Sequence, residues 1–124
     1  MINKELIDEY NNSIELLNSK LRQKYEKFVD IGIVIYGMGG GANNFYSLLK
    51  EINLDNIVKA ICYSDDYQCK YSFNPDLEIS SFSCIFQKYP DALYVIESDF
   101  VTDILSFVKK NPVIKNRIFK FICV

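Results

Sequence analysis

A glycine-rich turn is the segment of this chain whose residue types and spacing are best suited to chemistry. Gly37, Gly39 and Ala42 match the pattern G-x-G-x-x-G/A, with an apolar run at 31–36 before them and a helical pattern at 43–53 after them. In this context the first glycine permits a tight turn, the second lets a phosphate approach the backbone, and the third small residue lets a helix pack on a sheet. The free N–H groups and the dipole at a helix start favour an anion. The predicted phosphate-binding residues are Gly37, Met38, Gly39, Gly40, Gly41 and Ala42.

The residues after the turn limit what it can bind. Asn43 and Asn44 stand where a Walker A loop carries Lys and then Ser or Thr, so ATPase or kinase chemistry is not expected. The ligand that the pattern favours is a nucleotide or dinucleotide. The structural alternative is a glycine-rich connection that binds nothing.

Polar and aromatic residues follow the other strand-like runs, at the edge where open parallel sheets bind their ligands. Tyr63 stands where a dinucleotide-binding fold places the carboxylate that holds a ribose, and it can instead stack on a base. Asp65 and Asp66 lie slightly further on and either reach the ribose or are solvated loop acids. Glu97 is the best candidate for a functional carboxylate, whereas Ser98 also suits a helix cap. The further predicted binding residues are Tyr63, Ser64, Asp65, Glu97 and Ser98.

The chain has no histidine and four cysteines, which restricts its catalytic and metal chemistry. Ser-His-Asp and Cys-His arrangements are impossible without histidine, and no catalytic residue is predicted. No two cysteines are spaced as C-x-x-C, so we expect no metal site. Cys62 and Cys123 lie in apolar runs and are expected to be buried thiols, and all four cysteines are expected to be reduced and structural.

Apolar runs alternate with helical patterns along the chain after residue 30. This alternation predicts βαβ units and a parallel sheet. We expect an α/β, Rossmann-like, doubly wound sheet of five strands in the order 3-2-1-4-5, with helices on both faces. Strands are predicted at 31–36, 57–63, 77–79, 92–96 and 118–124, and helices at 43–53, from Ser80 or Ser81 to 88, and from Ser98 or Asp99 to 110.

A long amphipathic helix is predicted over residues 2–28, before the sheet. Seven apolar residues recur there at steps of three and four, a stripe that suits either a core-facing helix or a coiled-coil seam. The helix therefore packs on its own domain or pairs with a second subunit, as a homodimer or with a partner catalytic protein. We place the helix at 1–29 and a Rossmann-like nucleotide-binding domain at 30–124. The stripe consists of Leu6, Tyr10, Ile14, Leu17, Leu21, Tyr25 and Phe28.

The bulk composition of the 124 residues is that of one globular domain. Hydrophobic residues make up 49% and charged residues 24%, enough apolar material for a core. The formal net charge of −2 offers no basic surplus, so nucleic acid is not an expected partner. No apolar run approaches the length of a membrane span, and the acidic start lacks the apolar core of a signal peptide. A cytoplasmic protein with no membrane partner is expected.

Three segments together resemble a known bacterial module. They are Ile33–Ala42 with the glycine turn, Val58–Asp65, and Ala92–Ile96. They look like the small Rossmann-like, CoA-binding-type domain found with nucleotide-sugar epimerases and dehydratases, sugar acetyltransferases and FkbM-type methyltransferases. The resemblance covers about residues 31–124 and implies a role in surface-glycan or nucleotide-sugar metabolism, with NAD or a nucleotide-sugar as the ligand. In such modules the second strand often ends in Asp, where this chain has Tyr63.

Three functions are compatible with these features. The first is a non-catalytic or auxiliary nucleotide-binding module that serves a glycan enzyme. The second is an interaction protein that dimerises through the N-terminal helix and binds no nucleotide. The third, ranked last, is a small NAD-dependent or transferase enzyme subunit. An enzyme is the least favoured because the chain lacks histidine and a second domain to close over a substrate.

Overall fold

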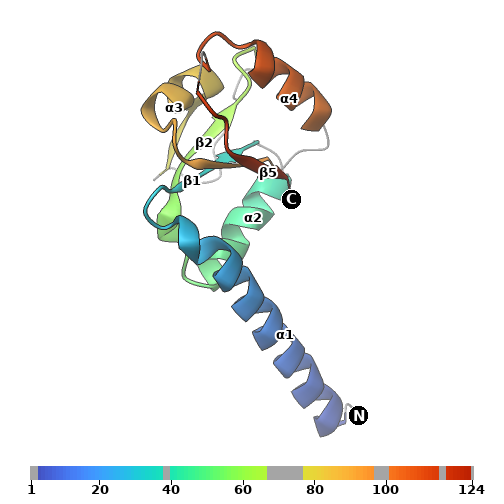
Figure 1. Cartoon of the computed structure of the whole chain (residues 1–124). Helices are drawn as coiled ribbons and strands as arrows, with labels where there is room; N and C mark the ends of the chain where they lie inside the picture. Colours follow the sequence, from blue (N-terminus) through green and yellow to red (C-terminus); the bar gives the residue numbers. More distant parts are fainter. Residues whose placement is uncertain (1–2, 38–39, 67–76, 97–100, 115–116, 124) are drawn as a thin grey trace.

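A computed structural model describes residues 3–37, 40–66, 77–96, 101–114 and 117–123 of the chain (Figure 1). It contains a long first helix and then alternating strands and helices, as the sequence predicts. The helices are α1 (Lys4–Tyr25), η1 (Glu26–Phe28), α2 (Gly40–Glu51), η2 (Asp55–Ile57), α3 (Phe82–Lys88) and α4 (Val101–Lys110). The strands are β1 (Ile33–Tyr36), β2 (Val58–Tyr63), β3 (Glu78–Ser81), β4 (Leu93–Ile96) and β5 (Phe121–Cys123).

The five strands form one parallel sheet in the order β3-β2-β1-β4-β5, which confirms the predicted fold class and strand order. Every residue of β1 and β4 is buried. Helices cover both faces of the sheet, so side chains on both sides of these strands are buried. This explains why the strands are continuous runs of Ile, Val, Leu and Tyr rather than alternating apolar and polar residues. The register sets Tyr36 level with Cys62 on one side and with Ile96 on the other. The carboxyl ends of the three central strands therefore lie side by side.

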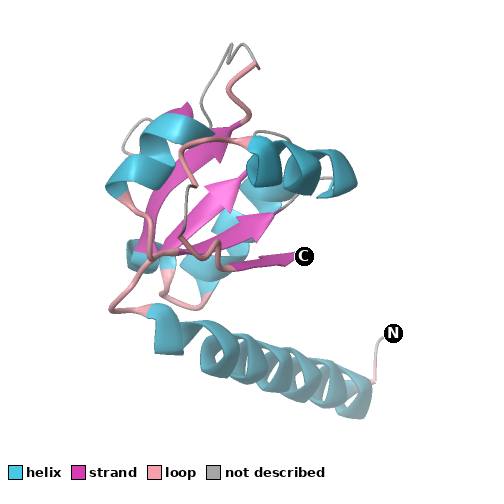
Figure 2. Cartoon of the chain, turned by 45° about the horizontal axis from the view of Figure 1, so that its top comes forward, coloured by secondary structure: helices cyan, strands magenta, loops and turns pink. Residues whose placement is uncertain are grey.

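Helices lie on both faces of the sheet (Figure 2), and each face carries its own apolar core. On one face, α2 and the end of α1 pack on Ile33, Ile35 and Val95. On the other face, α3 and α4 pack on Val34, Tyr36 and Tyr94. Helices on both faces are what right-handed crossovers produce when the chain moves first to one side of β1 and then to the other.

Aromatic rings dominate the core under α3 and α4. Phe82 is fully buried, and its ring lies 5.4 Å from that of Phe86, 5.8 Å from that of Tyr94 and 5.7 Å from that of Phe119. The pairs with Tyr94 and Phe119 are edge-to-face, the arrangement that ring quadrupoles favour. Phe82 begins α3 after Ser81, whose hydroxyl accepts from the Cys84 N–H at 3.5 Å, so one of the two predicted caps is confirmed.

The return from β4 to β5 differs from a simple helical crossover. Asn111, directly after α4, lies within hydrogen-bond distance of Asp65, which follows the carboxyl end of β2. The helix α4 therefore ends near the carboxyl edge of the sheet. Because β5 runs parallel to β4, the segment that contains the described residues 111–114 and 117–120 returns toward the amino edge. Phe119 in this segment fills the core, and the Lys120 carbonyl accepts from Tyr94 N at 2.9 Å.

The strand β5 is shorter than the sequence predicts and changes the environment of one cysteine. It covers Phe121–Cys123, and Cys123 is exposed rather than buried. The prediction of a buried thiol was wrong there, because β5 is an edge strand that has a neighbouring strand on one side only. Cys62, in the interior strand β2, is buried as predicted, whereas Cys84 is exposed and Cys69 lies outside the described residues.

Among the described residues, the last turns of α1 hold this helix to α2 and to the core. Tyr25 is buried, and its ring meets that of Phe45 in α2 edge-on at 5.4 Å. The Arg22 guanidinium donates to the carbonyl of Ile52 at 3.4 Å. Figure 1 shows the rest of α1 projecting away from the sheet and its other helices.

Candidate functional site

The glycine turn leaves β1 with a backbone that only glycine adopts freely. Gly37 has a φ of 145°, and its N–H donates to the Cys62 carbonyl of the neighbouring strand at 3.0 Å. A side chain at this φ would be strained, so the sequence correctly predicts why the first glycine is needed. Met38 and Gly39 lie outside the described residues.

The helix after the turn begins three residues earlier than the sequence predicts. It starts at Gly40, so Gly41 and Ala42 lie in its first turn. Ala42 is fully buried and packs in the core below α2, as the third position of the pattern requires. Packing of Ala42 and Phe45 outweighs the poor helix propensity of the two glycines, which is why the start was misplaced. The first backbone N–H groups of a helix have no carbonyl partner within it. In α2 these N–H groups belong to Gly40, Gly41 and Ala42, which the sequence predicts as phosphate-binding residues.

The turn lies at the switch point of the sheet. β1 has β2 on one side and β4 on the other, and α2 and α3 leave toward opposite faces. In open α/β sheets the crevice beyond the carboxyl ends of the strands at such a point is where ligands bind. An anion placed there would meet the positive end of the dipole of α2.

Tyr36, which the sequence pattern places only in a strand, lies beside the turn. The Tyr36 and Ser64 hydroxyls are 2.7 Å apart, which joins the ends of β1 and β2. Burial raises the pKa of Tyr36 well above its usual 10.0, and the nearby Cys62 and Asp65 act in the same direction, although the hydrogen bond to Ser64 lowers it. Tyr36 is therefore a neutral hydroxyl at this edge. Its position directly before the glycine was the signal that could have identified it.

Asp65 lies at the predicted edge, but its carboxylate is bound to other residues of the chain. One oxygen accepts from the Ser83 N–H at 2.9 Å, and the other accepts from the Ser83 hydroxyl and from the Asn111 side-chain amide, the latter at 3.1 Å. The carboxylate thus lies at the first turn of α3 and ties that helix to the end of α4. A ribose hydroxyl at Asp65 would have to share the carboxylate with these donors.

The remaining predicted residues are placed as follows. Tyr63 is half-buried and packs against the core on the α2 face, whereas Tyr36 packs on the opposite face. Ser64 is half-buried next to Tyr36. Glu97 and Ser98 lie outside the described residues. The structure thus brings Gly37, Tyr63 and Ser64 to the same edge of the sheet.

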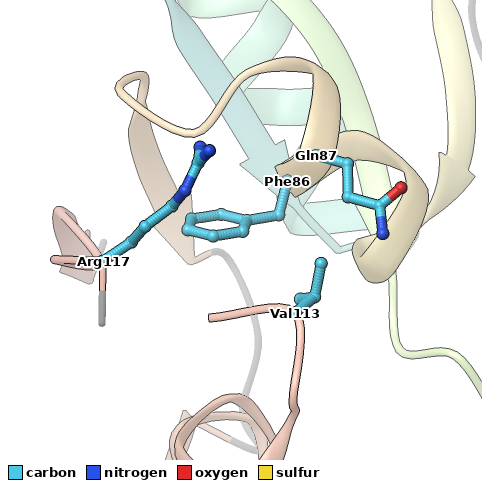
Figure 3. A pocket seen from close by; sticks show the side chains of 4 residues that line it. All are labelled: Phe86, Gln87, Val113 and Arg117. Carbon is cyan, nitrogen blue, oxygen red and sulfur yellow. The ribbon is translucent and has the colours of Figure 1, made fainter. Parts of the chain in front are cut away.

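A small open pocket lies between α3 and the described residues that follow α4 (Figure 3). It is lined by Phe86, Gln87, Val113 and Arg117. Figure 3 shows the Arg117 guanidinium near the Phe86 ring, whereas the Gln87 side chain extends in the opposite direction. No predicted site residue lines this pocket, so it does not coincide with the expected ligand crevice.

Within the described ranges, no cluster of three or more metal-ligating side chains is found. None of the helices in that part of the chain is long and apolar enough to cross a membrane. Comparisons with protein-family models, with curated proteins and with solved structures found no match for this chain.

Proposed function

We propose that the chain is a non-catalytic or auxiliary nucleotide-binding module whose ligand, NAD or a nucleotide-sugar, places its phosphates against the glycine turn. The observation that carries the proposal is the position of that turn. Gly37 leaves the central strand with a φ of 145° and leads into the start of α2 at the switch point of the sheet. Backbone N–H groups and a helix dipole directed at one place favour a phosphate there.

The neighbouring residues suit the remainder of a nucleotide. Tyr63 offers an aromatic side chain for stacking on a base, and Ser64 offers a hydroxyl next to that of Tyr36. Asp65 is the candidate for the ribose hydroxyls, in competition with Ser83 and Asn111. Glu97 and Ser98 directly follow β4, the other strand beside β1. In this proposal the ligand serves surface-glycan or nucleotide-sugar metabolism in bacteria.

The first test is a thermal-shift and calorimetric screen of the full chain. The ligands are NAD, NADP, CoA, S-adenosylmethionine, and UDP- and GDP-sugars. A ligand at a hundredfold excess over its dissociation constant stabilises the native state by about 2.7 kcal/mol, which raises the melting temperature by a readily measured amount. A shift with NAD or a nucleotide-sugar supports the proposal. No shift with any of the ligands contradicts it.

The second test assigns the site. Gly39→Val places a branched side chain at the phosphate position and should abolish the shift, while the melting temperature without ligand changes little. Asn56→Val introduces the same side chain at an exposed position of η2, before the amino end of β2, and should leave binding unchanged. Equal binding by both variants would show that the turn is not the phosphate site.

An interaction protein without a nucleotide is the second candidate function. It is favoured by the exposed apolar side chains of α1, among them Leu6, Tyr10 and Leu17. A chain that forms a complex through α1 and binds none of the screened ligands would support this candidate over the first.

A further inference from the structure

A pair of hydroxyl groups joins the carboxyl ends of β1 and β2 next to the glycine turn. The hydroxyl oxygens of Tyr36 and Ser64 are 2.7 Å apart, which is the usual length of a hydrogen bond between hydroxyls. Tyr36 is 1% exposed, whereas Ser64 is half-buried. One member of the pair therefore belongs to the core, and the other reaches the edge at which the proposed ligand binds.

The strand register explains why these two hydroxyls meet at the carboxyl edge. Tyr36 is level with Cys62, and the Gly37 N–H donates to the Cys62 carbonyl at 3.0 Å. Ser64 follows two residues later, so it lies roughly 6 Å further along the direction of the strands. The Tyr36 side chain must extend toward the carboxyl edge to reach it. The hydroxyl pair thus lies at the end of the sheet from which Gly37 leaves β1.

Burial determines which hydroxyl donates within the pair. Each hydroxyl has one proton to donate and lone pairs with which to accept. Tyr36 keeps its proton, because burial raises the pKa of this hydroxyl well above 10.0, and a buried proton without an acceptor would cost free energy. Within the described part of the chain, Ser64 is the partner of this hydroxyl. Tyr36 therefore donates, and Ser64 accepts.

This direction of donation makes Ser64 a donor toward the crevice. Its oxygen accepts on the side of the buried Tyr36, so its own proton is directed to the half-exposed side. A hydroxyl that accepts a hydrogen bond also donates a stronger one, because hydrogen bonds in a chain polarise one another. Ser64 is thus prepared for an acceptor that comes from outside the chain.

We infer that the Ser64 hydroxyl donates to a phosphate oxygen of the ligand, and that Tyr36 is a positioning residue that fixes Ser64 as the donor. The inference rests on the proposed function and adds a second phosphate contact to the N–H groups at the start of α2. Ala42 of α2 packs on one face of the sheet and Tyr36 packs on the other. A pyrophosphate in the crevice would therefore be held from both sides.

The chemistry of Ser64 and of the next residue favours a phosphate over a ribose at Ser64. Phosphate oxygens only accept, so they match a donor whose direction is fixed. The ionised carboxylate of Asp65 only accepts, so it suits a ribose hydroxyl, which has a proton to donate. The two adjacent residues thus match two adjacent groups of a nucleotide.

Calorimetric titration of full-chain variants with NAD, UDP-glucose and GDP-mannose tests the contact. Ser64→Thr keeps the hydroxyl, and Ser64→Val has the same branched shape without it. For any probe that the wild-type chain binds, Ser64→Val should raise the dissociation constant by at least about 10-fold, as expected for a hydrogen bond to a charged group. Ser64→Thr should stay within about 3-fold of the wild type.

Tyr36→Phe tests the positioning role. It should raise the dissociation constant by about 3- to 10-fold in the wild-type background and should have no effect in the Ser64→Val background, because Tyr36 acts through the Ser64 hydroxyl. Tyr94→Phe is the matched control. Tyr94 is also fully buried, and its hydroxyl donates to the Tyr89 carbonyl at 3.0 Å, but Tyr89 precedes the amino end of β4. Tyr94→Phe should bind like the wild type, and circular dichroism checks that every variant folds.

Several results would overturn this inference and leave the proposed function standing. In the first, the wild type and Ser64→Val bind a probe equally. In the second, Ser64→Thr loses as much affinity as Ser64→Val, so that the hydroxyl is not the contact. In the third, the effect of Tyr36→Phe persists in Ser64→Val or is matched by Tyr94→Phe, so that Tyr36 acts through the stability of the fold. A wild-type chain that binds none of the probes contradicts the proposed function, and this inference with it.

Discussion

The hydroxyl groups of Tyr36 and Ser64 lie 2.7 Å apart and join the carboxyl ends of β1 and β2 directly beside the glycine turn. Tyr36 is buried and Ser64 is half-buried, so the bond satisfies two polar groups at the edge of the core. This contact holds the two strands from which Gly37 and Tyr63 reach the proposed ligand crevice.

Alkaline pH should destabilise the chain through its buried tyrosines. Burial raises the pKa values of Tyr36 and Tyr94 well above the usual 10.0, so the folded state keeps protons that the unfolded state has released. The stability contributed by the raised pKa is complete below pH 10 and is lost as pH rises toward the folded-state pKa. Each retained proton steepens the fall by up to about 1.4 kcal/mol per pH unit.

The measurement is urea unfolding at several pH values on either side of pH 10. Tyr36→Phe should reduce the alkaline slope and cost about 1 kcal/mol at neutral pH, because it leaves Ser64 without this hydrogen bond. Tyr10→Phe is the control, since the Tyr10 side chain is 66% exposed. An unchanged slope in Tyr36→Phe would mean that Tyr36 ionises in the folded state as readily as in the unfolded one.

Asp65→Ala should destabilise the chain by about 1 kcal/mol, because the carboxylate accepts from the first turn of α3 and from Asn111. Asp66→Ala removes the neighbouring exposed carboxylate and should change the free energy of unfolding by much less. Chemical denaturation of the two variants compares them directly. Equal stabilities would show that the bonds to Ser83 and Asn111 contribute nothing net. With a ligand in hand, loss of affinity in Asp65→Ala alone would support a ribose contact.

Asp65 also shows where prediction from the sequence ends. Its place at the end of the second strand follows from strand periodicity and glycine spacing, and so do the sheet order and the need for glycine at position 37. Its partners Ser83 and Asn111 are 18 and 46 residues away in the chain. No local pattern encodes such contacts, because they depend on how α3 and the end of α4 meet after folding.

The N-terminal helix shows a second reason why the sequence does not predict every contact. The apolar stripe predicted from the sequence exists, but the same residue types pack on the core at Leu21 and Tyr25 and remain exposed at Leu6 and Tyr10. Periodicity reports which face is apolar and not what covers it. The length of α1 beyond the edge of the sheet determines which part of the stripe is exposed, and that length becomes known only with the tertiary structure.

Phe82→Ala should cost about 3–5 kcal/mol, the usual range for removing a fully buried phenylalanine side chain. The ring is surrounded by those of Tyr36, Phe86, Tyr94 and Phe119, which cannot close the space without moving strands or α3. Phe121→Ala on the edge strand is the matched control and should cost much less, because that side chain is 42% exposed. Comparable losses of unfolding free energy in the two variants would contradict the placement of the aromatic core.

Gly32→Ala should destabilise the chain for two separable reasons. Gly32 has a φ of 82°, which costs an L-residue about 1–2 kcal/mol, and a Cβ there would lie 2.6 Å from Cγ of Lys59. The second effect is relieved if Lys59 is shortened, whereas the first is not. A double-mutant cycle of Gly32→Ala and Lys59→Ala, measured by chemical denaturation, should therefore show the double variant less destabilised than the sum of the single changes. A residual cost of about 1–2 kcal/mol should remain from the backbone. Strict additivity would mean that the Lys59 side chain moves aside freely, and full recovery would mean that Gly32 does not need its positive φ.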